Sequence, residues 1–262
     1  MSRAYIGTSG WNYREWRGSF FPDDLPTKQW LSFYASRFNS VEVNYSFYRL
    51  PSKEICESWY EQTPARFRFA IKASRYVTHI KRLRDSRESW DTFLKRVLIL
   101  KQKLGPILLQ FPENFRASEA NLQTLDDFLR YAARSRRLAL EFRDSSCFGQ
   151  EMLALLHKHR VALVISHSSR YPVPEITATT NFVYFRFHGP KAMFASSYSD
   201  AELRDWARIM KSFMRTRHDV YAYFNNDSGG HAPRNAQVLL QQFRSNSRNS
   251  QVRLRKHVAD TS

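Results

Sequence analysis

Charged residues interrupt three hydrophobic segments of the chain in a pattern that could support proton transfer and anion binding. Glu42 lies between two valines, Lys72 closes the segment 67–72, and Glu141 follows Ala139 and Leu140. Side chains alternate between the two faces of a strand, so each of these residues would point to one defined face. Carboxylates can act as general acid and base, and His188 could share that work. We therefore predict Glu42, Lys72, Glu141 and His188 as catalytic residues.

A second set of polar residues follows the same segments and is suited to substrate binding. Arg143 and Arg186, together with Lys72, could bind a phosphate or a carboxylate. His79 lies in a basic segment after the third hydrophobic segment, where it could close over the site. The predicted substrate-binding residues are Asn44, His79, Gln110, Arg143, Arg186, Tyr223, Asn225 and Asp227.

Two other kinds of site are weighed against anion binding. Lys72 could form a Schiff base with a carbonyl substrate, but with two arginines nearby we favour the anion-binding role. Glu42, Glu141, His188 and Asp227 are potential metal ligands, yet the sequence has no HxxH or HExxH spacing. We therefore predict no metal site, and the sequence specifies no cofactor.

Strand-like and helix-like segments alternate along most of the chain, which indicates a parallel sheet covered by helices. The predicted strands are Ala4–Thr8, Ser40–Tyr45, Phe67–Lys72, Pro106–Phe111, Arg137–Phe142, Val161–Ile165, Phe182–His188 and Asp219–Asn225. A barrel of eight strand-helix units needs about 250 residues, and the chain has 262. We predict an α/β protein with a TIM-type (β/α)8 barrel, in which catalytic groups come from the carboxyl ends of the strands.

The helices have recognisable starts, with one irregular place. Ser199 and Glu202 form a capping box, and Pro233 suits the first turn of the last helix. Residues 168–181 contain Pro172 and Pro174 and no helical periodicity, so we expect the sixth helix to be absent or replaced by a loop. We assign residues 1–243 to one barrel domain and residues 244–262 to a flexible basic tail.

The composition narrows the class of protein and its partners. The formal net charge is +17, and twelve Lys or Arg face three acidic residues between positions 66 and 103. We name residues 66–103 the basic segment. Its positive electrostatic field attracts polyanions, although an ordinary solvated basic surface explains the excess of positive charge equally well. Two cysteines are too few for a disulfide framework. We find neither a signal-peptide pattern nor a hydrophobic membrane span, and expect a cytoplasmic protein with no membrane partner.

Motifs spread over residues 4–243 resemble the YecE-like family, also called domain of unknown function 72. They include Gly7-Thr8-Ser9-Gly10-Trp11, Val41-Glu42-Val43-Asn44, Gln110-Phe111-Pro112, Glu141-Phe142-Arg143, Arg186-Phe187-His188-Gly189 and Tyr223-Phe224-Asn225-Asn226-Asp227. The resemblance implies a TIM-type barrel and marks the same polar strand ends, but it supplies no reaction. The chain departs from the family pattern at Asp144, Cys147 and His167.

Three functions fit these observations, in decreasing order of preference. The first is a hydrolase or lyase acting on a small anionic or phosphorylated substrate, such as a nucleotide, a nucleic acid or a sugar phosphate. The second is a nucleic-acid-binding protein without catalysis, using the basic segment and aromatic residues such as Tyr76 and Trp90. The third, a metal-dependent sugar isomerase or lyase, rests on fold analogy alone. The sequence does not specify an oligomeric state.

Overall fold

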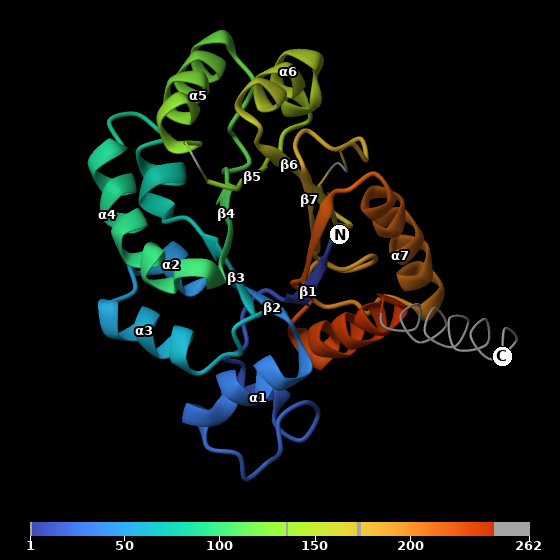
Figure 1. Cartoon of the computed structure of the whole chain (residues 1–262). Coiled ribbons are helices and arrows are strands. Elements are labelled where there is room, and N and C mark those ends of the chain that lie inside the picture. Colours follow the sequence, from blue (N-terminus) through green and yellow to red (C-terminus); the bar gives the residue numbers. More distant parts are fainter. Residues whose placement is uncertain (1, 135, 172–173, 244–262) are drawn as a thin grey trace, which may run out of the picture.

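The protein folds into a nearly closed barrel of eight parallel strands surrounded by helices (Figure 1). The computed structural model describes residues 2–134, 136–171 and 174–243. The strands are β1 Ala4–Thr8, β2 Ser40–Val43, β3 Arg68–Lys72, β4 Leu104–Gln110, β5 Leu138–Glu141, β6 Ala162–His167, β7 Phe182–Phe187 and β8 Asp219–Phe224. Strands β2 to β8 pair with one another in sequence order, and β1 pairs with β8. The predicted TIM-type barrel is confirmed, and no strand boundary differs from the prediction by more than two residues.

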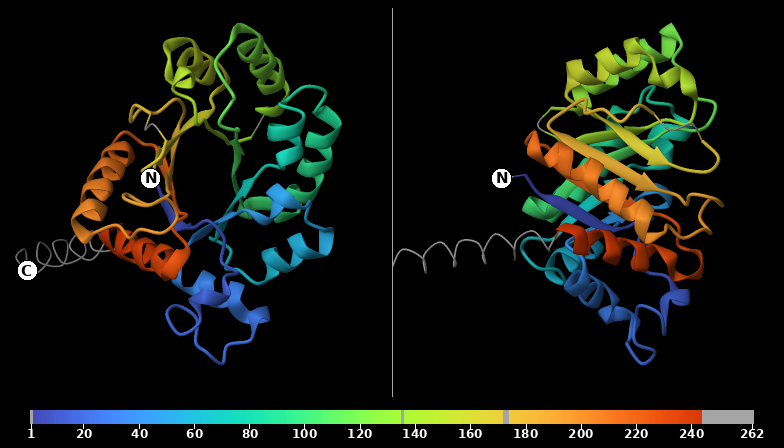
Figure 2. Two further views of the ribbon diagram at one scale, coloured as in Figure 1. Left: turned by 180° about the vertical axis from the view of Figure 1, so that it is seen from behind. Right: turned by 90° about the vertical axis from the view of Figure 1, so that its right-hand side faces the viewer.

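Helices lie outside the strands around most of the barrel, as the side view shows (Figure 2). They are α1 Trp30–Arg37, α2 Tyr45–Tyr48, α3 Lys53–Glu61, α4 Arg87–Val97, α5 Glu119–Ala132, α6 Gln150–His159, α7 Asp200–Arg215 and a last helix over residues 231–243. The predicted capping box at Ser199 and Glu202 starts α7, and Pro233 lies in the first turn of the last helix. Both predicted helix starts are confirmed.

The barrel is irregular between β6 and β7. No helix forms among residues 168–171 and 174–181, so the described part of this connection is a loop, as predicted. The predicted basic tail, residues 244–262, lies outside the described residues. Within the described ranges, no helix has both the length and the hydrophobicity needed to cross a bilayer.

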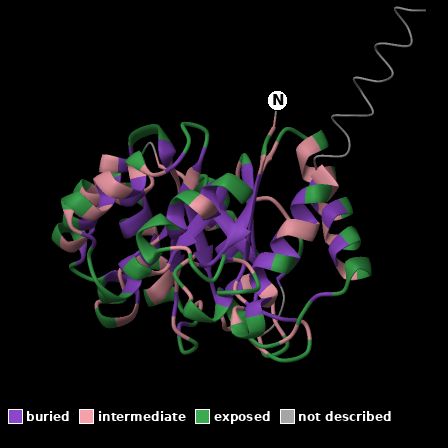
Figure 3. Cartoon of the chain, turned by 90° about the horizontal axis from the view of Figure 1, so that it is seen from below, coloured by how far each residue is buried: buried purple, intermediate pink, exposed green. Residues whose placement is uncertain are grey.

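Two separate sets of buried hydrophobic side chains stabilise the barrel. One lies inside it and includes Tyr5, Leu108, Tyr184 and Tyr221. The other is larger and lies between the outer face of the strands and the helices. Buried residues accordingly concentrate in the strands, while exposed residues lie on the loops and outer helix surfaces (Figure 3).

Side chains complete the barrel where β1 and β2 meet. Asn39 accepts a hydrogen bond from the Ile6 amide at 3.0 Å and donates one to the Ala4 carbonyl at 2.7 Å. The Tyr34 hydroxyl accepts from the Thr8 amide at 2.8 Å. A Cβ atom at Gly7 would lie 2.0 Å from the Ser40 carbonyl oxygen, so only glycine fits there. Just beyond the end of β1, the backbones of Ser9 and Glu42 form an isolated parallel β-bridge. This bridge continues the pairing of β1 and β2 towards the site.

Candidate active site

The candidate active site lies at the carboxyl ends of the strands, where inward-facing side chains change from apolar to charged. In β7 the inward positions are Phe182, Tyr184 and then Arg186, and in β5 Ala139 is followed by Glu141. Arg186 and Glu141 are almost completely buried. Charges buried at this depth require partners, and the partners come from other strands.

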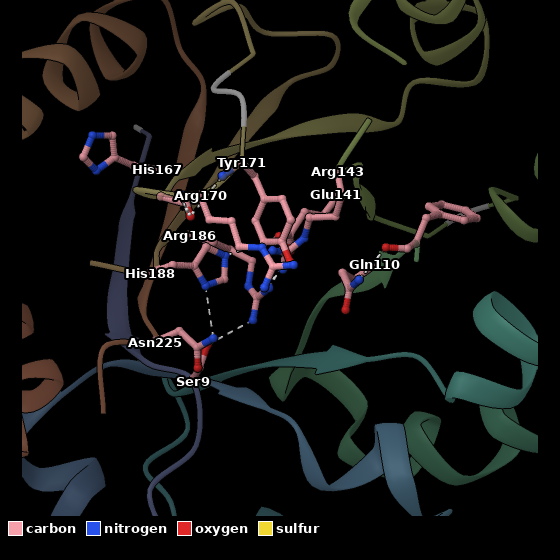
Figure 4. A network of polar contacts seen from close by, with 12 residues as sticks. Ser9, Gln110, Glu141, Arg143, His167, Arg170, Tyr171, Arg186, His188 and Asn225 are labelled. Atoms are coloured by element: carbon pink, nitrogen blue, oxygen red, sulfur yellow. Dashed lines mark hydrogen bonds and ion pairs between the residues drawn. The ribbon is translucent and has the colours of Figure 1, made fainter. Parts of the chain in front are cut away.

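Arg186 is the centre of the buried polar network (Figure 4). Its Nε and Nη2 atoms donate to the two oxygens of Glu42 at 3.0 and 2.8 Å. Its Nη1 donates to Glu141 Oε2 at 2.5 Å. Tyr184 donates to Glu42 Oε2 at 2.7 Å, and Ser9 donates to Glu42 Oε1. Arg186 was predicted to clamp an anion, but these two carboxylates already occupy its guanidinium group.

Glu141 is held in its ionised form by its neighbours. Burial alone would raise the pKa of Glu141, but Arg143 and Arg186 outweigh burial and hold the pKa well below its ordinary value. Arg143 Nη2 lies 2.9 Å from Glu141 Oε1. A permanently ionised, doubly paired carboxylate is a poor proton donor. The geometry therefore favours a positioning role for Glu141 over the predicted catalytic one.

His188 has both ring nitrogens occupied. Nε2 lies 3.3 Å from Glu141 Oε1, and Nδ1 lies 3.1 Å from the Asn225 amide nitrogen. A carboxylate accepts and an amide NH2 donates, so the neutral ring with its proton on Nε2 satisfies both contacts. Burial lowers the pKa of His188 to about 4, which keeps the ring neutral at pH 7. His188 consequently orients Asn225 and has no nitrogen left for substrate in this arrangement.

Lys72 is a cation without a carboxylate partner. Its Nζ lies 3.9 Å from the centre of the Phe47 ring, and no Asp or Glu of the described residues comes within 4.0 Å of it. Burial, followed by the charge of Arg186, lowers the pKa of Lys72 to about 8. His79 also packs on Phe47, with ring centres 5.1 Å apart. Burial and the charge of Lys72 lower the pKa of His79 to about 4, so His79 is neutral beside this cation.

Arg143 lies next to the loop between β6 and β7. Its guanidinium carbon lies 4.1 Å from the centre of the Tyr171 ring, and Tyr171 donates through its hydroxyl to Glu113. Figure 4 shows Arg143, Glu141 and Tyr171 close together. Arg143 Nε is buried and has no hydrogen-bond partner among the described residues. The irregular loop thus covers one face of an arginine that retains an unused donor.

In the described part of the chain, three more buried polar atoms without a hydrogen-bond partner lie just after β2 and β8. They are Asn44 Oδ1, Asn226 Oδ1 and Asp227 Oδ1. Burial raises the pKa of Asp227 to about 7, and the nearby negative charge of Glu42 adds to the effect. The nearby Tyr13 hydroxyl, which donates to the Ser9 carbonyl at 2.6 Å, opposes this shift. The pKa of Asp227 is thus suited to proton transfer at neutral pH.

The other predicted substrate-binding residues have different surroundings. Gln110 Nε2 donates to the Phe111 carbonyl at 2.5 Å. Tyr223 is fully buried and its hydroxyl lies 2.6 Å from Ser40 Oγ, which leaves no surface for a substrate. Its predicted binding role is therefore corrected: it packs inside the barrel below the site.

The three departures from the family motifs lie away from the charged network. Asp144 caps the short 3-10 helix Ser145–Phe148 by accepting from the Ser146 amide. Cys147 is buried, and burial raises the pKa of its thiol to about 11. His167 Nδ1 lies 2.9 Å from the Tyr198 hydroxyl on the helix side of β6.

Sequence reasoning missed several partners of the predicted residues. Tyr184 is not one of them, because the strand parity that it shares with Arg186 and His188 already predicts that it faces the same side. Ser9, Tyr13 and Tyr171 come from connections whose course the hydrophobic pattern does not define. In the residues that the structure describes, no three His, Cys, Asp or Glu side chains are grouped as metal ligands.

Comparisons with known proteins agree with the motifs. The family model described as Protein of unknown function DUF72 matches residues 5–258. The chain is 28% identical to the UPF0759 protein YunF of Bacillus subtilis, over 90% of this chain and 93% of that protein. It is 32% identical to the UPF0759 protein YecE of Escherichia coli K12, over 63% of this chain and 59% of that protein.

Solved structures support the same assignment. The crystal structure of a DUF72 family protein from Thermotoga maritima has a TM-score of 0.84 and 29% identity, covering 92% of this chain and 99% of that one. A glycoside hydrolase family 5 enzyme from Prevotella bryantii has a TM-score of 0.51 and 10% identity, covering 91% and 95%, which shows a shared barrel fold alone. With the family model matching nearly the whole chain, the protein belongs to the DUF72 family.

Proposed function

We propose that the protein is a hydrolase or lyase that binds a phosphate-bearing substrate at the carboxyl ends of the strands. The observation that carries this proposal is the unpaired charge of Lys72. Arg186 is neutralised by Glu42 and Glu141, and Arg143 shares Glu141, so the cations of this network outnumber its paired carboxylates. Lys72 is partly buried. A partly buried charge without a partner is unfavourable, and a bound anion would offset that cost.

Two cationic groups could hold the phosphate together. Lys72 offers a compact ammonium group, and Arg143 offers the buried Nε donor that no described residue uses. Both residues interact electrostatically with Glu141, and both lower the pKa of His79, which supports a role for the two cations in binding one anion. Phosphate oxygens accept charge-assisted hydrogen bonds from ammonium and guanidinium groups.

Asp227 is the proposed proton-transfer group. Its pKa of about 7 allows it to accept a proton from water or substrate and to return it at neutral pH. Glu42 and Glu141, which the sequence suggested for this work, instead hold Arg186 and Arg143 in place. The retained Schiff-base alternative for Lys72 needs a neutral amine, which a pKa of about 8 supplies in a minor fraction at pH 7.

The proposal can be tested by equilibrium binding and turnover at fixed salt. Inorganic phosphate and a panel of phosphate monoesters would be titrated against wild type, Lys72→Met and the matched control Lys28→Met. Lys28 is exposed and takes no part in the charged network, so its loss removes the same charge from a solvated surface. We expect Lys72→Met to abolish phosphate binding and Lys28→Met to preserve it. Turnover should disappear in Asp227→Asn while binding persists. Equal binding by wild type and Lys72→Met would refute the proposed site.

Nucleic-acid binding without catalysis is the second candidate, because one exposed loop carries several cations. Arg75, Arg82 and Arg84 are exposed and follow β3 at the end of the barrel where Lys72 lies. Tyr76 is 43% exposed, whereas Trp90 is fully buried and unavailable for base contacts. This candidate predicts affinity for single-stranded oligonucleotides that falls steeply with salt and survives Lys72→Met and Asp227→Asn.

A further inference from the structure

An aromatic pocket lies next to the proposed phosphate site and has no role in the charged network. It has a volume of about 480 Å³, and its walls include Trp11, Tyr45, Tyr48 and Trp59. Trp11 and Tyr45 both meet Trp59 edge to face, with ring centres 5.7 and 6.3 Å apart. This volume falls in the range of small-molecule sites.

The pocket and Lys72 lie on two sides of the short helix α2. Phe47 packs under Lys72, whose Nζ is 3.9 Å from the ring centre. The Phe47 ring in turn contacts the ring of Tyr48, with centres 5.1 Å apart, and Tyr48 forms a pocket wall. Ser46, in the same turn, donates to the Lys72 carbonyl at 2.6 Å. A single aromatic ring therefore separates the unpaired ammonium from the aromatic wall.

The polar groups of the pocket suit a flat ring with a polar edge. Apart from the hydroxyl and indole groups of its aromatic residues, its polar side chains are Asn12 and Asn44. Asn44 Oδ1 is a buried acceptor that no described residue uses, and an unused amide oxygen accepts from an amino or ring N–H group. A sugar ring carries hydroxyl groups around its whole rim, which these few polar groups could not satisfy. A nucleobase has two apolar faces and hydrogen-bonding groups confined to its edge, which match these walls and this acceptor.

From this juxtaposition we infer that the substrate is a nucleoside phosphate whose base stacks in the aromatic pocket. The inference rests on the proposed phosphate site, and it specifies the class of substrate for that site. Lys72 and Arg143 hold the phosphate, the base stacks against Tyr48, and Asn44 accepts a hydrogen bond from the base edge. Tyr48 is 75% exposed, so its ring contributes little to the core and is available for stacking.

The test compares ligands that differ by one part. Adenosine and cytidine monophosphates, ribose 5-phosphate and inorganic phosphate would be titrated by calorimetry against wild type, Tyr48→Ala, Tyr48→Phe and Lys72→Met. We expect a nucleoside monophosphate to bind wild type about tenfold or more tightly than ribose 5-phosphate. Tyr48→Ala should remove that advantage and leave inorganic phosphate affinity unchanged. Tyr48→Phe, which keeps the ring, should retain it.

The outcomes separate this inference from the proposed function. If inorganic phosphate fails to bind wild type, or binds Lys72→Met equally well, the phosphate site is wrong and the inference falls with it. If phosphate binding depends on Lys72 but neither nucleotide binds better than ribose 5-phosphate, only the inference is overturned. An unchanged nucleotide affinity in Tyr48→Ala would also overturn it. Because Tyr48 is largely exposed, loss of folding is not expected, and circular dichroism of each variant would verify this.

Discussion

Arg186 and Glu42 form a two-point ion pair inside the barrel, with Nε to Oε2 at 3.0 Å and Nη2 to Oε1 at 2.8 Å. The pair joins β7 to β2 across the barrel interior, and Glu141 extends it to β5. Each of these three residues is almost completely buried. A buried pair of this kind makes the charged network a structural element on which the site is built.

The first prediction concerns the stability of this network. Arg186→Met would leave two buried carboxylates without their shared cation, and we expect it to lower the free energy of unfolding by about 3–5 kcal/mol. Urea denaturation would measure the change. The matched control is Arg208→Met, because Arg208 pairs with Asp205 on the surface and is 78% exposed. Arg208→Met should lower the free energy of unfolding by at most about 1 kcal/mol. Similar losses in both variants would contradict the structural role of the network.

A second prediction follows from the raised pKa of Asp227. An unfolded aspartate has a pKa of about 3.9, and folding raises the pKa of Asp227 to about 7. The folded state therefore binds the proton more tightly, and this stabilising contribution is present below about pH 4 and lost as the pH rises to about 7. Asp227→Asn does not titrate. Its unfolding free energy relative to wild type should increase between pH 4 and pH 8 by on the order of 1–3 kcal/mol. If the unfolding free energies of wild type and Asp227→Asn changed with pH in parallel, Asp227 would have an ordinary pKa.

The seam between β1 and β2 supports a third prediction. Asn39→Ala would remove two hydrogen bonds and leave the Ile6 amide and the Ala4 carbonyl without these partners. We expect a loss of about 1–3 kcal/mol, because the site is partly buried and water can replace some of the lost contacts. Thermal unfolding should show a melting temperature lower by several degrees. The control is Ser36→Ala, which removes one exposed hydroxyl contact to the Phe33 carbonyl and should have little effect.

The fourth prediction separates the two roles considered for Lys72. Lys72→Arg keeps a cation but cannot form a Schiff base, so phosphate binding should persist in this variant. Borohydride treatment of wild type with a carbonyl compound should leave no covalent adduct at Lys72, as judged by mass spectrometry of its peptide. An adduct that appears in wild type and is absent in Lys72→Arg would favour the Schiff-base role instead.

The barrel was largely predictable because each strand is a short hydrophobic segment between helix or loop signals. Alternation also placed Glu42, Lys72, Glu141 and Arg186 on inward-facing positions, since strand parity is a local property. Parity does not reveal which of these charges pair with one another. Arg186 looked like an anion clamp because its two carboxylate partners lie 45 and 144 positions away in the sequence.

Contacts from irregular segments could not be predicted. Tyr171 reaches Arg143 from the loop between β6 and β7, and Phe47 reaches Lys72 from the short helix α2. Both contacts depend on backbone courses that hydrophobic periodicity does not define. The aromatic pocket has the same origin, because Trp11 lies in the irregular segment after β1 and Tyr48 in the short helix α2 after β2.

The most direct test of the phosphate site is the pH dependence of ribose 5-phosphate affinity in wild type and Lys72→Arg. A phosphate monoester is a dianion above about pH 6, and burial lowers the pKa of Lys72 to about 8. Wild-type affinity should therefore fall about tenfold between about pH 7.5 and pH 9.5 as Lys72 loses its charge. The affinity of Lys72→Arg for ribose 5-phosphate should remain nearly constant over the same pH range, since arginine does not deprotonate there. Matching pH profiles for the two proteins would contradict the assignment of Lys72 as the phosphate-binding cation.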